Sequence, residues 1–341
     1  MSEHRLLILY TGGTIGMIQP QGSDALIPFD FSNLLGHLPE ISRFQCKIGY
    51  HVFDPPLDSS DMDPSQWLNI AAVIFENRDA YDSFVVLHGS DTMAYTASAL
   101  SFILKNLGKP VILTGSQLPV GEIRTDAREN LITAIEIATT CPYPLAEVCI
   151  YFDYLLIRGN RAHKTSVQSF DAFHSYNYRI LAEARTTIQY FPMRFLPKPT
   201  EAPTFHNALC TDVAVLKFFP GLQKNYMQAL IETPNLRALV IESFGAGNLP
   251  LRPWLFELLA FAQQKEIIVV NITQCESGTV EMGKYETSRY LSNYGVVSGY
   301  DMTTEAVVTK LMYLCAQESD YSRLQKLCSA NLRGELTEIR S

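Results

Sequence analysis

The sequence predicts an α/β protein with two domains: a larger N-terminal domain with a mostly parallel sheet and helices on both faces, and a smaller C-terminal α/β domain. Short apolar runs alternate with segments of helical spacing, which is the pattern of parallel strands joined by crossover helices. The chain has 341 residues, 47% of them hydrophobic, so it can bury more than one core.

The domain limits follow from where this alternation lapses. We expect a first domain over residues 1–189 and a second over residues 211–341. Between them, residues 190–210 hold four prolines and no regular spacing, a composition typical of a linker.

The individual elements can be placed from apolar spacing and from end signals. In the first domain we expect strands at residues 6–10, 48–53, 83–87, 110–113 and 149–156, and helices at 65–76, 93–107 and 127–138. Asp63 followed by Pro64 favours the start of the first helix, and Gly108 the end of the second. In the second domain we expect strands at residues 213–218, 238–242 and 267–271, and helices at 254–263 and 305–315.

Composition argues against several classes of partner. The formal net charge is −8 and there is no basic block, so neither nucleic acid nor an anionic membrane is expected as a partner. No apolar run is long enough to span a bilayer, and the start of the chain lacks a signal-peptide pattern. The seven cysteines never form a C-x-x-C pair, which favours a reduced, cytoplasmic compartment. A small molecule is the expected partner.

Signatures of metals and cofactors are also missing from the sequence. It has no H-E-x-x-H motif, and its seven histidines do not cluster at ligand spacing. The glycine turn near the N-terminus has neither dinucleotide nor P-loop spacing. We therefore expect no metal and no cofactor.

That glycine turn, Thr11-Gly12-Gly13-Thr14-Ile15-Gly16, follows the first expected strand. One interpretation is an ordinary tight turn. The other is that its glycines bring backbone N–H groups close to a developing oxyanion, while Thr14 carries a nucleophilic hydroxyl. Because a threonine hydroxyl is a weak nucleophile at neutral pH, the second interpretation requires a base or a proton chain nearby.

A second glycine turn, His88-Gly89-Ser90-Asp91, follows the strand at residues 83–87. Ser90 and Asp91 can cap the next helix. They can also act on a ligand, with Ser90 as a proton relay and Asp91 as the partner of a substrate ammonium group. For His88, a buried and hydrogen-bonded role is favoured over a catalytic one. Since open parallel sheets bind ligands where their strands end, the two turns mark the expected site.

Two further groups have both a structural and a functional interpretation. Lys164 is either a solvated lysine or the missing base, since desolvation and the nearby Arg158 and Arg161 favour a neutral amine. The segment Asp58-Ser59-Ser60 is either a plain polar turn or a grip for a substrate carboxylate. Residues 18–28 form either a lid or an ordinary surface loop.

These motifs, in this order, resemble the L-asparaginase family, in particular its bacterial type I, cytoplasmic-like branch. The resemblance runs nearly end to end. It is carried by residues 10–17, 58–62 and 88–100, by Arg158-Gly159-Asn160-Arg161 with Lys164, and by residues 245–248 and 301–306.

The resemblance implies a two-domain asparaginase-like fold. It also implies a cofactor-free amidohydrolase that converts L-asparagine to L-aspartate and ammonia through an acyl-threonine. By position, the implied catalytic residues are Thr14, Ser90, Asp91 and Lys164, and the implied substrate-binding residues are Asp58, Ser59, Ser60, Ser90 and Asp91. A homodimer or homotetramer is implied as well. The alternatives are a glutaminase-asparaginase and a low-activity, amino-acid-binding relative.

Two positions depart from the family pattern. Most relatives have threonine where this chain has Ser90, so the methyl group that restricts χ1 is missing. Many relatives have a lid tyrosine where this chain has Leu26, which cannot hydrogen-bond the nucleophile. The looser serine rotamer predicts slower turnover. For Leu26, either another group replaces the lost contact or the enzyme is slow.

Overall fold

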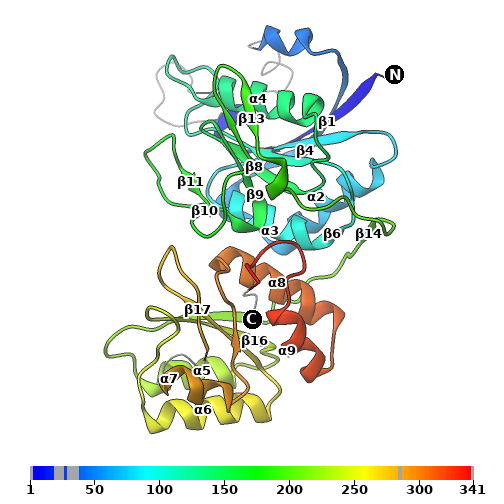
Figure 1. Ribbon diagram of the computed structural model, residues 1–341. Coiled ribbons are helices and arrows are strands. Elements are labelled where there is room, and N and C mark those ends of the chain that lie inside the picture. The colour runs from blue at the N-terminus through cyan, green and yellow to red at the C-terminus, as the bar shows by residue number, and fades with distance from the viewer. Residues whose placement is uncertain (1–2, 19–26, 29–37, 283–285, 339–341) are drawn as a thin grey trace. The chain divides into compact units, whose positions relative to one another are not determined.

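The computed structural model describes residues 3–18, 27–28, 38–282 and 286–338 (Figure 1). The chain forms two compact units, Met1–Asn207 and Ala208–Ser341. Each unit is described below by itself.

Unit 1 is built on an eight-stranded sheet in the order β13-β12-β9-β8-β7-β5-β1-β4. The neighbouring strands β4, β1, β5, β7 and β8 pair in parallel. The strands β9, β12 and β13 continue the sheet beyond β8 with antiparallel pairing. Their bounds are β1 His4–Gly12, β4 Cys46–Leu57, β5 Ser83–Leu87, β7 Val111–Thr114, β8 Val148–Phe152, β9 Leu155–Arg158, β12 Ala182–Ala184 and β13 Ile188–Tyr190. The mostly parallel sheet expected from the sequence is confirmed.

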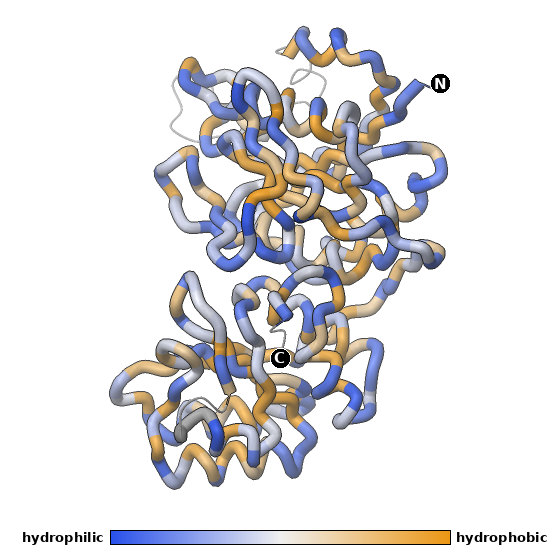
Figure 2. The backbone as a smooth tube through the Cα atoms, viewed as in Figure 1, coloured by the Kyte–Doolittle hydropathy of each residue, from blue (hydrophilic) through white to orange (hydrophobic). Residues whose placement is uncertain are grey.

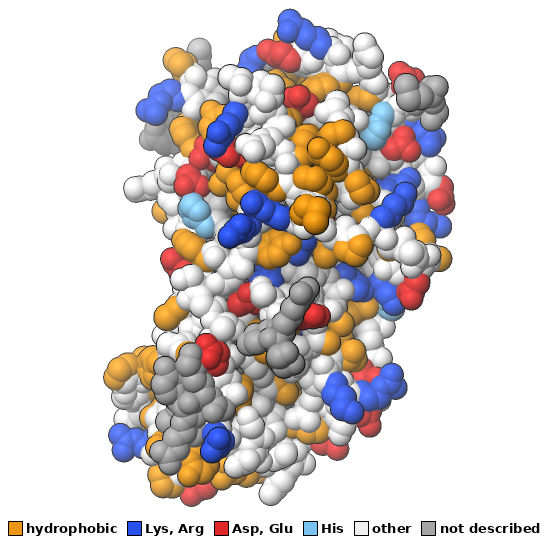
Figure 3. Space-filling view, in the orientation of Figure 1, with side chains coloured by type: hydrophobic (Ala, Val, Ile, Leu, Met, Phe, Trp, Pro, Cys, Tyr) orange, Lys and Arg blue, Asp and Glu red, His pale blue; other side chains and the backbone are white. Residues whose placement is uncertain are grey.

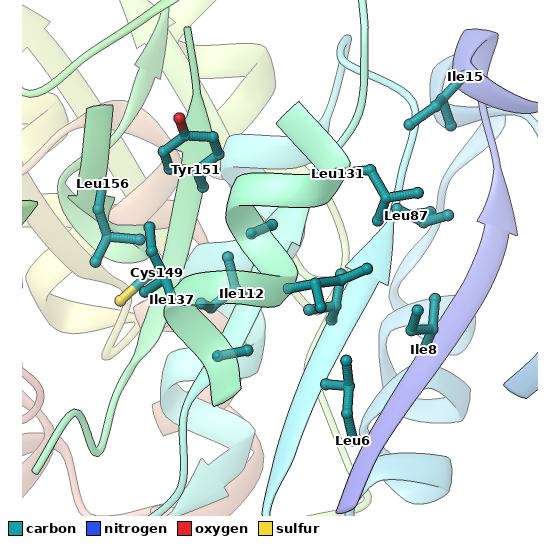
Figure 4. Close-up of a cluster of buried hydrophobic side chains, with 14 of the residues drawn as sticks. Leu6, Ile8, Ile15, Leu87, Ile112, Leu131, Ile137, Cys149, Tyr151 and Leu156 are labelled. Atoms are coloured by element: carbon teal, nitrogen blue, oxygen red, sulfur yellow. The ribbon is translucent and has the colours of Figure 1, made fainter. Parts of the chain in front are cut away.

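Within the described residues, three helices cover this sheet on both faces, as expected: α2 (Pro64–Glu76), α3 (Met93–Ile103) and α4 (Ala127–Thr140). In Figure 1, α4 lies on one face, and α2 and α3 lie on the other. Asp63 caps α2 in a capping box with Gln66, which confirms the predicted helix start. The core between α4 and the sheet contains side chains such as Leu6, Leu87 and Leu131 (Figure 4).

The order of the strands creates a topological switch point. The chain leaves β1 toward β4 on one side of the sheet order, whereas it leaves β5 toward β7 on the other side. In the parallel register, Tyr10 pairs with Leu87 and Leu87 pairs with Thr114, so β1, β5 and β7 end at one level. Because the connections diverge there, a ligand crevice is expected at the carboxyl ends of β1 and β5.

The single strand predicted over residues 149–156 is wrong, because the chain turns back within it. Asp153 and Tyr154 have φ values of 44° and 69°. Two successive residues with positive φ form a tight hairpin turn, so β8 and β9 pair antiparallel.

The helix predicted over residues 93–107 is too long, because α3 ends at Ile103. Leu104 and Lys105 leave the helix as β6 (Leu104–Lys105) and pair with β14 (Thr204–Phe205). Tertiary pairing here overrides the apolar helical spacing.

The described part of unit 1 also contains two further strand pairs and the stretch before β14. The pairs are β2 (Met17–Ile18) with β3 (Ile27–Pro28), and β10 (His163–Lys164) with β11 (Phe173–His174). Between β13 and β14, the backbone N–H of Leu196 donates to Glu147 at 2.8 Å. The predicted boundaries, 1–189, 190–210 and 211–341, stay a proposal about which pieces fold on their own.

Unit 2 is a four-stranded parallel sheet in the order β15-β16-β17-β18. Its strands are β15 Val213–Lys217, β16 Ala238–Ser243, β17 Ile268–Thr273 and β18 Val297–Ser298. Its helices are α5 Lys224–Glu232, α6 Pro253–Gln264, α7 Glu286–Ser292, α8 Thr304–Gln317 and α9 Tyr321–Ser329. Figure 1 shows α8 and α9 on the face of the sheet opposite α5 and α6. The smaller C-terminal α/β domain is thereby confirmed.

The distribution of hydrophobic and charged residues matches the positions of the two cores. In Figure 2 the central strands of each unit are hydrophobic and the outer turns are hydrophilic. On the face drawn in Figure 3, acidic and basic side chains are interspersed. Within the described residues, no helix has the length and apolar character required to cross a membrane.

Candidate active site

The turn that carries Thr14 begins where β1 ends at Gly12. Gly12 and Gly13 have φ values of 131° and 89°, which L side chains rarely adopt. They turn the chain into a short 3-10 helix, Thr14–Gly16, that opens with Thr14. The Thr11 hydroxyl donates to the Leu87 carbonyl at 2.8 Å and fastens the end of β1 to the end of β5.

The Thr14 turn and the Ser90 turn touch through their glycines. A Cβ atom added to Gly13 would lie 2.5 Å from the backbone nitrogen of Gly89. No side chain larger than hydrogen fits at Gly13, and the close approach brings Thr14 and Ser90 onto neighbouring loops. The two hydroxyl residues predicted at strand ends therefore lie on loops in direct contact.

Ser90, Asp91 and Lys164 form one connected group. Lys164 Nζ donates to Ser90 Oγ at 2.9 Å and to Asp91 Oδ1 at 2.7 Å. The lysine side chain is 14% exposed, whereas that of Asp91 is 60% exposed. The amine is therefore held at the inner end of the group and the carboxylate at its open end. A solvated, unattached Lys164 is not what the structure shows.

The positive charge expected around Lys164 is partly compensated. Arg158 forms a buried ion pair with Glu147 at 2.5 Å, and its guanidinium lies over the Tyr178 ring. Arg161 lies over the same ring, with 5.3 Å between its guanidinium carbon and the ring centroid. Arg158 thus has a buried carboxylate partner of its own, which the sequence did not indicate.

The Asp58-Ser59-Ser60 turn lies against the Ser90 turn. A Cβ atom on Gly89 would come within 2.6 Å of the Ser59 Cβ, and Thr92 Oγ1 donates to the Ser59 carbonyl at 2.6 Å. Asp58 Oδ1 accepts from the backbone N–H of Ser60 at 2.8 Å and from its hydroxyl at 2.9 Å. These bonds lie within the turn, as in the plain-turn interpretation, and the turn also adjoins the loops of Thr14 and Ser90.

The alternative in which Ser90 or Asp91 caps the following helix is wrong. The N-cap of α3 is Thr92, and no side chain makes a capping hydrogen bond there. Both side chains instead accept hydrogen bonds from Lys164, and neither bonds to the N–H groups at the start of α3.

His88 has the buried, hydrogen-bonded role favoured from the sequence. Its Nδ1 lies 2.7 Å from the Gly89 carbonyl and its Nε2 lies 2.9 Å from Thr96 Oγ1. A carbonyl only accepts, so Nδ1 carries the proton and Nε2 accepts from the threonine. Burial lowers the pKa of His88 to about 4, although the Gly89 carbonyl acts in the opposite direction. The neutral ring supports the Ser90 turn from beneath.

Gln117 is a site residue that the sequence reasoning missed. It follows β7, the strand next to β5, and Ser90 Oγ donates to its Oε1 at 3.4 Å. The polar turn 114–117 after a buried strand was the available signal. An amide gives little indication of a role until its orientation is known.

The geometry thus unites most of the predicted residues. Ser90, Asp91 and Lys164 are in direct contact, while Thr14 and the turn at residues 58–60 are placed by contacts between their loops. Leu26, on the expected lid, lies outside the described residues. In the described part of the chain, no cluster of three or more histidine, cysteine, aspartate or glutamate residues could hold a metal ion.

Taken together, fold and site define a doubly wound α/β protein with hydroxyl, carboxylate and amine groups at the switch point of its sheet. The chain belongs to the asparaginase family. Residues 5–194 match the family model described as "Asparaginase, N-terminal", and residues 212–327 match "Glutaminase/Asparaginase C-terminal domain".

Individual relatives support the same assignment. The chain is 42% identical to L-asparaginase 1 of Escherichia coli K12 over 99% of each chain. The crystal structure of L-asparaginase I from Vibrio cholerae has a TM-score of 0.91 and 40% identity, covering 99% of this chain and 100% of that one. The thermostable L-asparaginase from Thermococcus kodakarensis has a TM-score of 0.90 and 32% identity, with 98% and 100% covered.

Proposed function

We propose that this chain is an L-asparaginase that hydrolyses L-asparagine to L-aspartate and ammonia without a cofactor. The observation that carries the proposal is the Lys164–Ser90–Asp91 group, held against the Thr14 turn at the switch point of the sheet. Family membership and the end-to-end similarity to proteins named L-asparaginase give the substrate.

Thr14 is the proposed nucleophile. Its hydroxyl oxygen attacks the carboxamide carbon, and the oxyanion that forms is stabilised by backbone N–H groups of the glycine turns. When the C–N bond breaks, the nitrogen takes a proton and leaves as ammonia, so that an acyl-Thr14 ester remains. Water then attacks the ester, which releases aspartate and returns the proton to Thr14.

Ser90 and Lys164 are the proposed proton carriers, acting as one unit with Thr14. The 2.9 Å contact between Lys164 Nζ and Ser90 Oγ is short enough for direct proton transfer. An amine that has given up its proton can accept one from a hydroxyl, and the ammonium can later protonate the leaving nitrogen.

Substrate recognition is assigned to two carboxylates and two serines. Asp91 uses Oδ1 for Lys164, which leaves Oδ2 at its exposed end for the substrate ammonium group. Ser59 and Ser60 are the proposed contacts of the α-carboxylate. In this structure the N–H and the hydroxyl of Ser60 both donate to Asp58 Oδ1, which holds the turn in shape, so Ser60 would turn a donor from Asp58 to the substrate on binding. Recognition of both charged groups fixes the carboxamide in reach of Thr14.

A cytoplasmic location and a homodimeric or homotetrameric state are part of the proposal, and they come from the resemblance to the type I branch. Gel filtration with light scattering tests the oligomeric state. A monomer at working concentration would contradict that part alone.

The proposal is tested by ammonia release from asparagine and glutamine by the purified chain. We expect asparagine to give the higher kcat/KM. A preference for glutamine would support the glutaminase-asparaginase alternative. Tight asparagine binding in isothermal titration calorimetry, together with negligible ammonia release, would contradict the proposal and favour an amino-acid-binding relative.

A further inference from the structure

The Ser90 hydroxyl is held from two sides. Lys164 Nζ donates to Oγ at 2.9 Å, and Oγ donates to Gln117 Oε1 at 3.4 Å. Because an ammonium group can only donate, the serine hydrogen must point to another acceptor. Gln117 is that acceptor as long as Lys164 keeps the proton that it donates to Ser90 Oγ.

The orientation of the Gln117 amide is set by a neighbour from another loop. Its Nε2 donates to the Ser169 carbonyl at 2.9 Å. Since a carbonyl only accepts, the NH2 end must face Ser169 and the oxygen must face Ser90. Ser90 therefore meets a pure acceptor.

The backbone that carries Gln117 is held by α4. The Gln117 N–H lies 2.9 Å from Asp126 Oδ2 and 3.1 Å from Oδ1, and the Leu118 N–H lies 3.1 Å from Oδ1. The fully buried Asn130 donates from Nδ2 to the Gly115 carbonyl at 3.0 Å and to Asp126 Oδ2 at 3.1 Å. The amide is thus presented by a supported loop.

The same loop lies directly against the Ser90 turn. A Cβ atom on Gly115 would overlap the His88 carbonyl oxygen and come within 3.0 Å of Met93 Cε. The contact between Gly115 and His88 therefore fixes the backbones that carry Gln117 and Ser90 relative to each other. The Gln117 side chain then spans the remaining distance to Ser90 Oγ.

Serine needs such support more than threonine does. Without a β-methyl group, its χ1 angle has three accessible wells, and only some of them keep Oγ near the lysine. A 3.4 Å hydrogen bond is long and contributes little energy by itself. Its direction nevertheless favours the well in which Oγ lies between Gln117 and Lys164.

We propose that Gln117 is a positioning residue that holds Ser90 in the rotamer facing Lys164. It thereby replaces the restriction that a β-methyl group would give at this position. Gln117 acts on the reaction only through Ser90. This role rests on the proposed hydrolase function. It makes Gln117 the residue that allows a serine to act at position 90.

The first part of the test removes the acceptor. Gln117→Met keeps the length of the side chain but has no oxygen, so we expect kcat on asparagine to fall about three- to tenfold. KM should stay within about twofold, because no substrate contact is removed. The matched control is Gln189→Met on the edge strand β13, where Gln189 is exposed. It should retain the wild-type kcat.

The second part asks whether a methyl group can take over. Ser90→Thr should raise kcat by about threefold or more in the Gln117→Met background, and by a clearly smaller factor in the wild-type background. A residue that merely holds the fold together would not show this dependence on the side chain at position 90. Equal effects of Ser90→Thr in both backgrounds would overturn the proposal, as would a wild-type kcat in Gln117→Met.

Folding and function are separated by two more measurements. If Gln117→Met loses its near-UV circular dichroism signal, Gln117→Ala takes its place, because truncation leaves the backbone bonds to Asp126 intact. Crystal structures should show one Ser90 rotamer in the wild type and several in Gln117→Ala. A wild type that releases no ammonia would contradict the proposed function. A single, unchanged Ser90 rotamer in Gln117→Ala would contradict the role of Gln117.

Discussion

At the scale of single residues, a nearly buried amine joins a hydroxyl to an exposed carboxylate. Lys164 contacts Ser90 Oγ and Asp91 Oδ1 within 3 Å, and the carboxylate faces outward. Ser90 and Asp91 can hold the Lys164 amine in place while it loses a proton and regains it. Asp91 supplies a fixed negative charge on the open side, where a substrate ammonium group would approach.

Replacing Lys164 by a side chain of similar length without the amine should stop proton transfer and still fill the space of the lysine. Lys164→Met is expected to lower kcat by roughly 10²- to 10⁴-fold, the usual contribution of a positioned acid or base. Steady-state ammonia release measures the loss. Lys224→Met is the matched control, because Lys224 is a 45% exposed lysine paired with Glu257 at 3.0 Å. Equal activity of the two variants would remove Lys164 from the mechanism.

His88 should make unit 1 less stable in mild acid. Its pKa falls from 6.5 to about 4 on burial, so the unfolded chain binds this proton more tightly than the folded one. The stability is fully present above pH 6.5 and is lost as the pH falls toward 4, by about 3 kcal/mol at most.

Chemical denaturation at several pH values measures this slope. His88→Gln, which cannot be protonated, should show a flatter dependence over the same window. If the variant and the wild type lose stability in parallel, other groups are responsible.

At the scale of elements, the site is a product of strand order. Parallel strands ending at one level place the turns at residues 12–14, 57–60 and 88–91 beside one another, and two of the glycines allow their backbones to touch. Neighbouring strand ends thus supply the hydroxyl and carboxylate residues of the site, whereas Lys164 comes from β10, outside the eight-stranded sheet.

Gly13 tests that contact. Gly13→Ala places a methyl group against the Gly89 backbone at a φ of 89°, so we expect a loss of about 1–3 kcal/mol in the stability of unit 1 and a marked loss of activity. Thermal unfolding and ammonia release measure both. Gly121→Ala is the control, since an added Cβ at Gly121 has nothing within 4 Å. Comparable behaviour of the two variants would mean that the turns need not touch.

Many of the helices and strands could be predicted from the sequence, because strand ends and helix caps have local sequence signals. The buried strand before Ser90 and the Asp63-Pro64 helix start were both placed correctly. The β8–β9 hairpin was missed because Tyr154 stands where such turns usually have glycine, although Asp153 before it is a common turn residue. The end of α3 was missed because its partner strand lies about a hundred residues away in the sequence.

Some site residues could likewise be predicted from the sequence and others could not. Thr14, Ser90 and Lys164 could be named from motif and family resemblance, and their loops do adjoin. Gln117 could not, because its role depends on the Ser169 carbonyl and on Asp126, which are contacts made only in the folded chain. The pairing of Arg158 with Glu147 was likewise invisible and changed the expected surroundings of Lys164.

At the scale of the whole molecule, each unit has its own core and its own buried ion pair. In unit 2, Lys310 and Glu335 lie 2.7 Å apart with 1% and 0% of their side chains exposed. Burial alone would raise the pKa of Glu335, but Lys310 and the N–H groups of Leu332 and Arg333 lower it overall. The pair fastens the segment after α9 to α8.

Breaking that pair should destabilise unit 2. Lys310→Met leaves the Glu335 carboxylate buried without its ammonium partner, at an expected cost of about 3–5 kcal/mol. Denaturant unfolding measures the cost. Adding Glu335→Leu should recover much of it, because no buried charge then remains. A double variant as unstable as the single one would show that packing, not charge, holds the segment.

The central claim is that the Thr14 hydroxyl attacks the substrate carboxamide at the switch point of the unit 1 sheet. The most direct measurement compares Thr14→Ala with the wild type in ammonia release from asparagine, with asparagine binding followed by calorimetry. We expect the variant to bind asparagine with similar affinity and to lose activity by about a thousandfold or more. A variant that keeps wild-type turnover would contradict the claim.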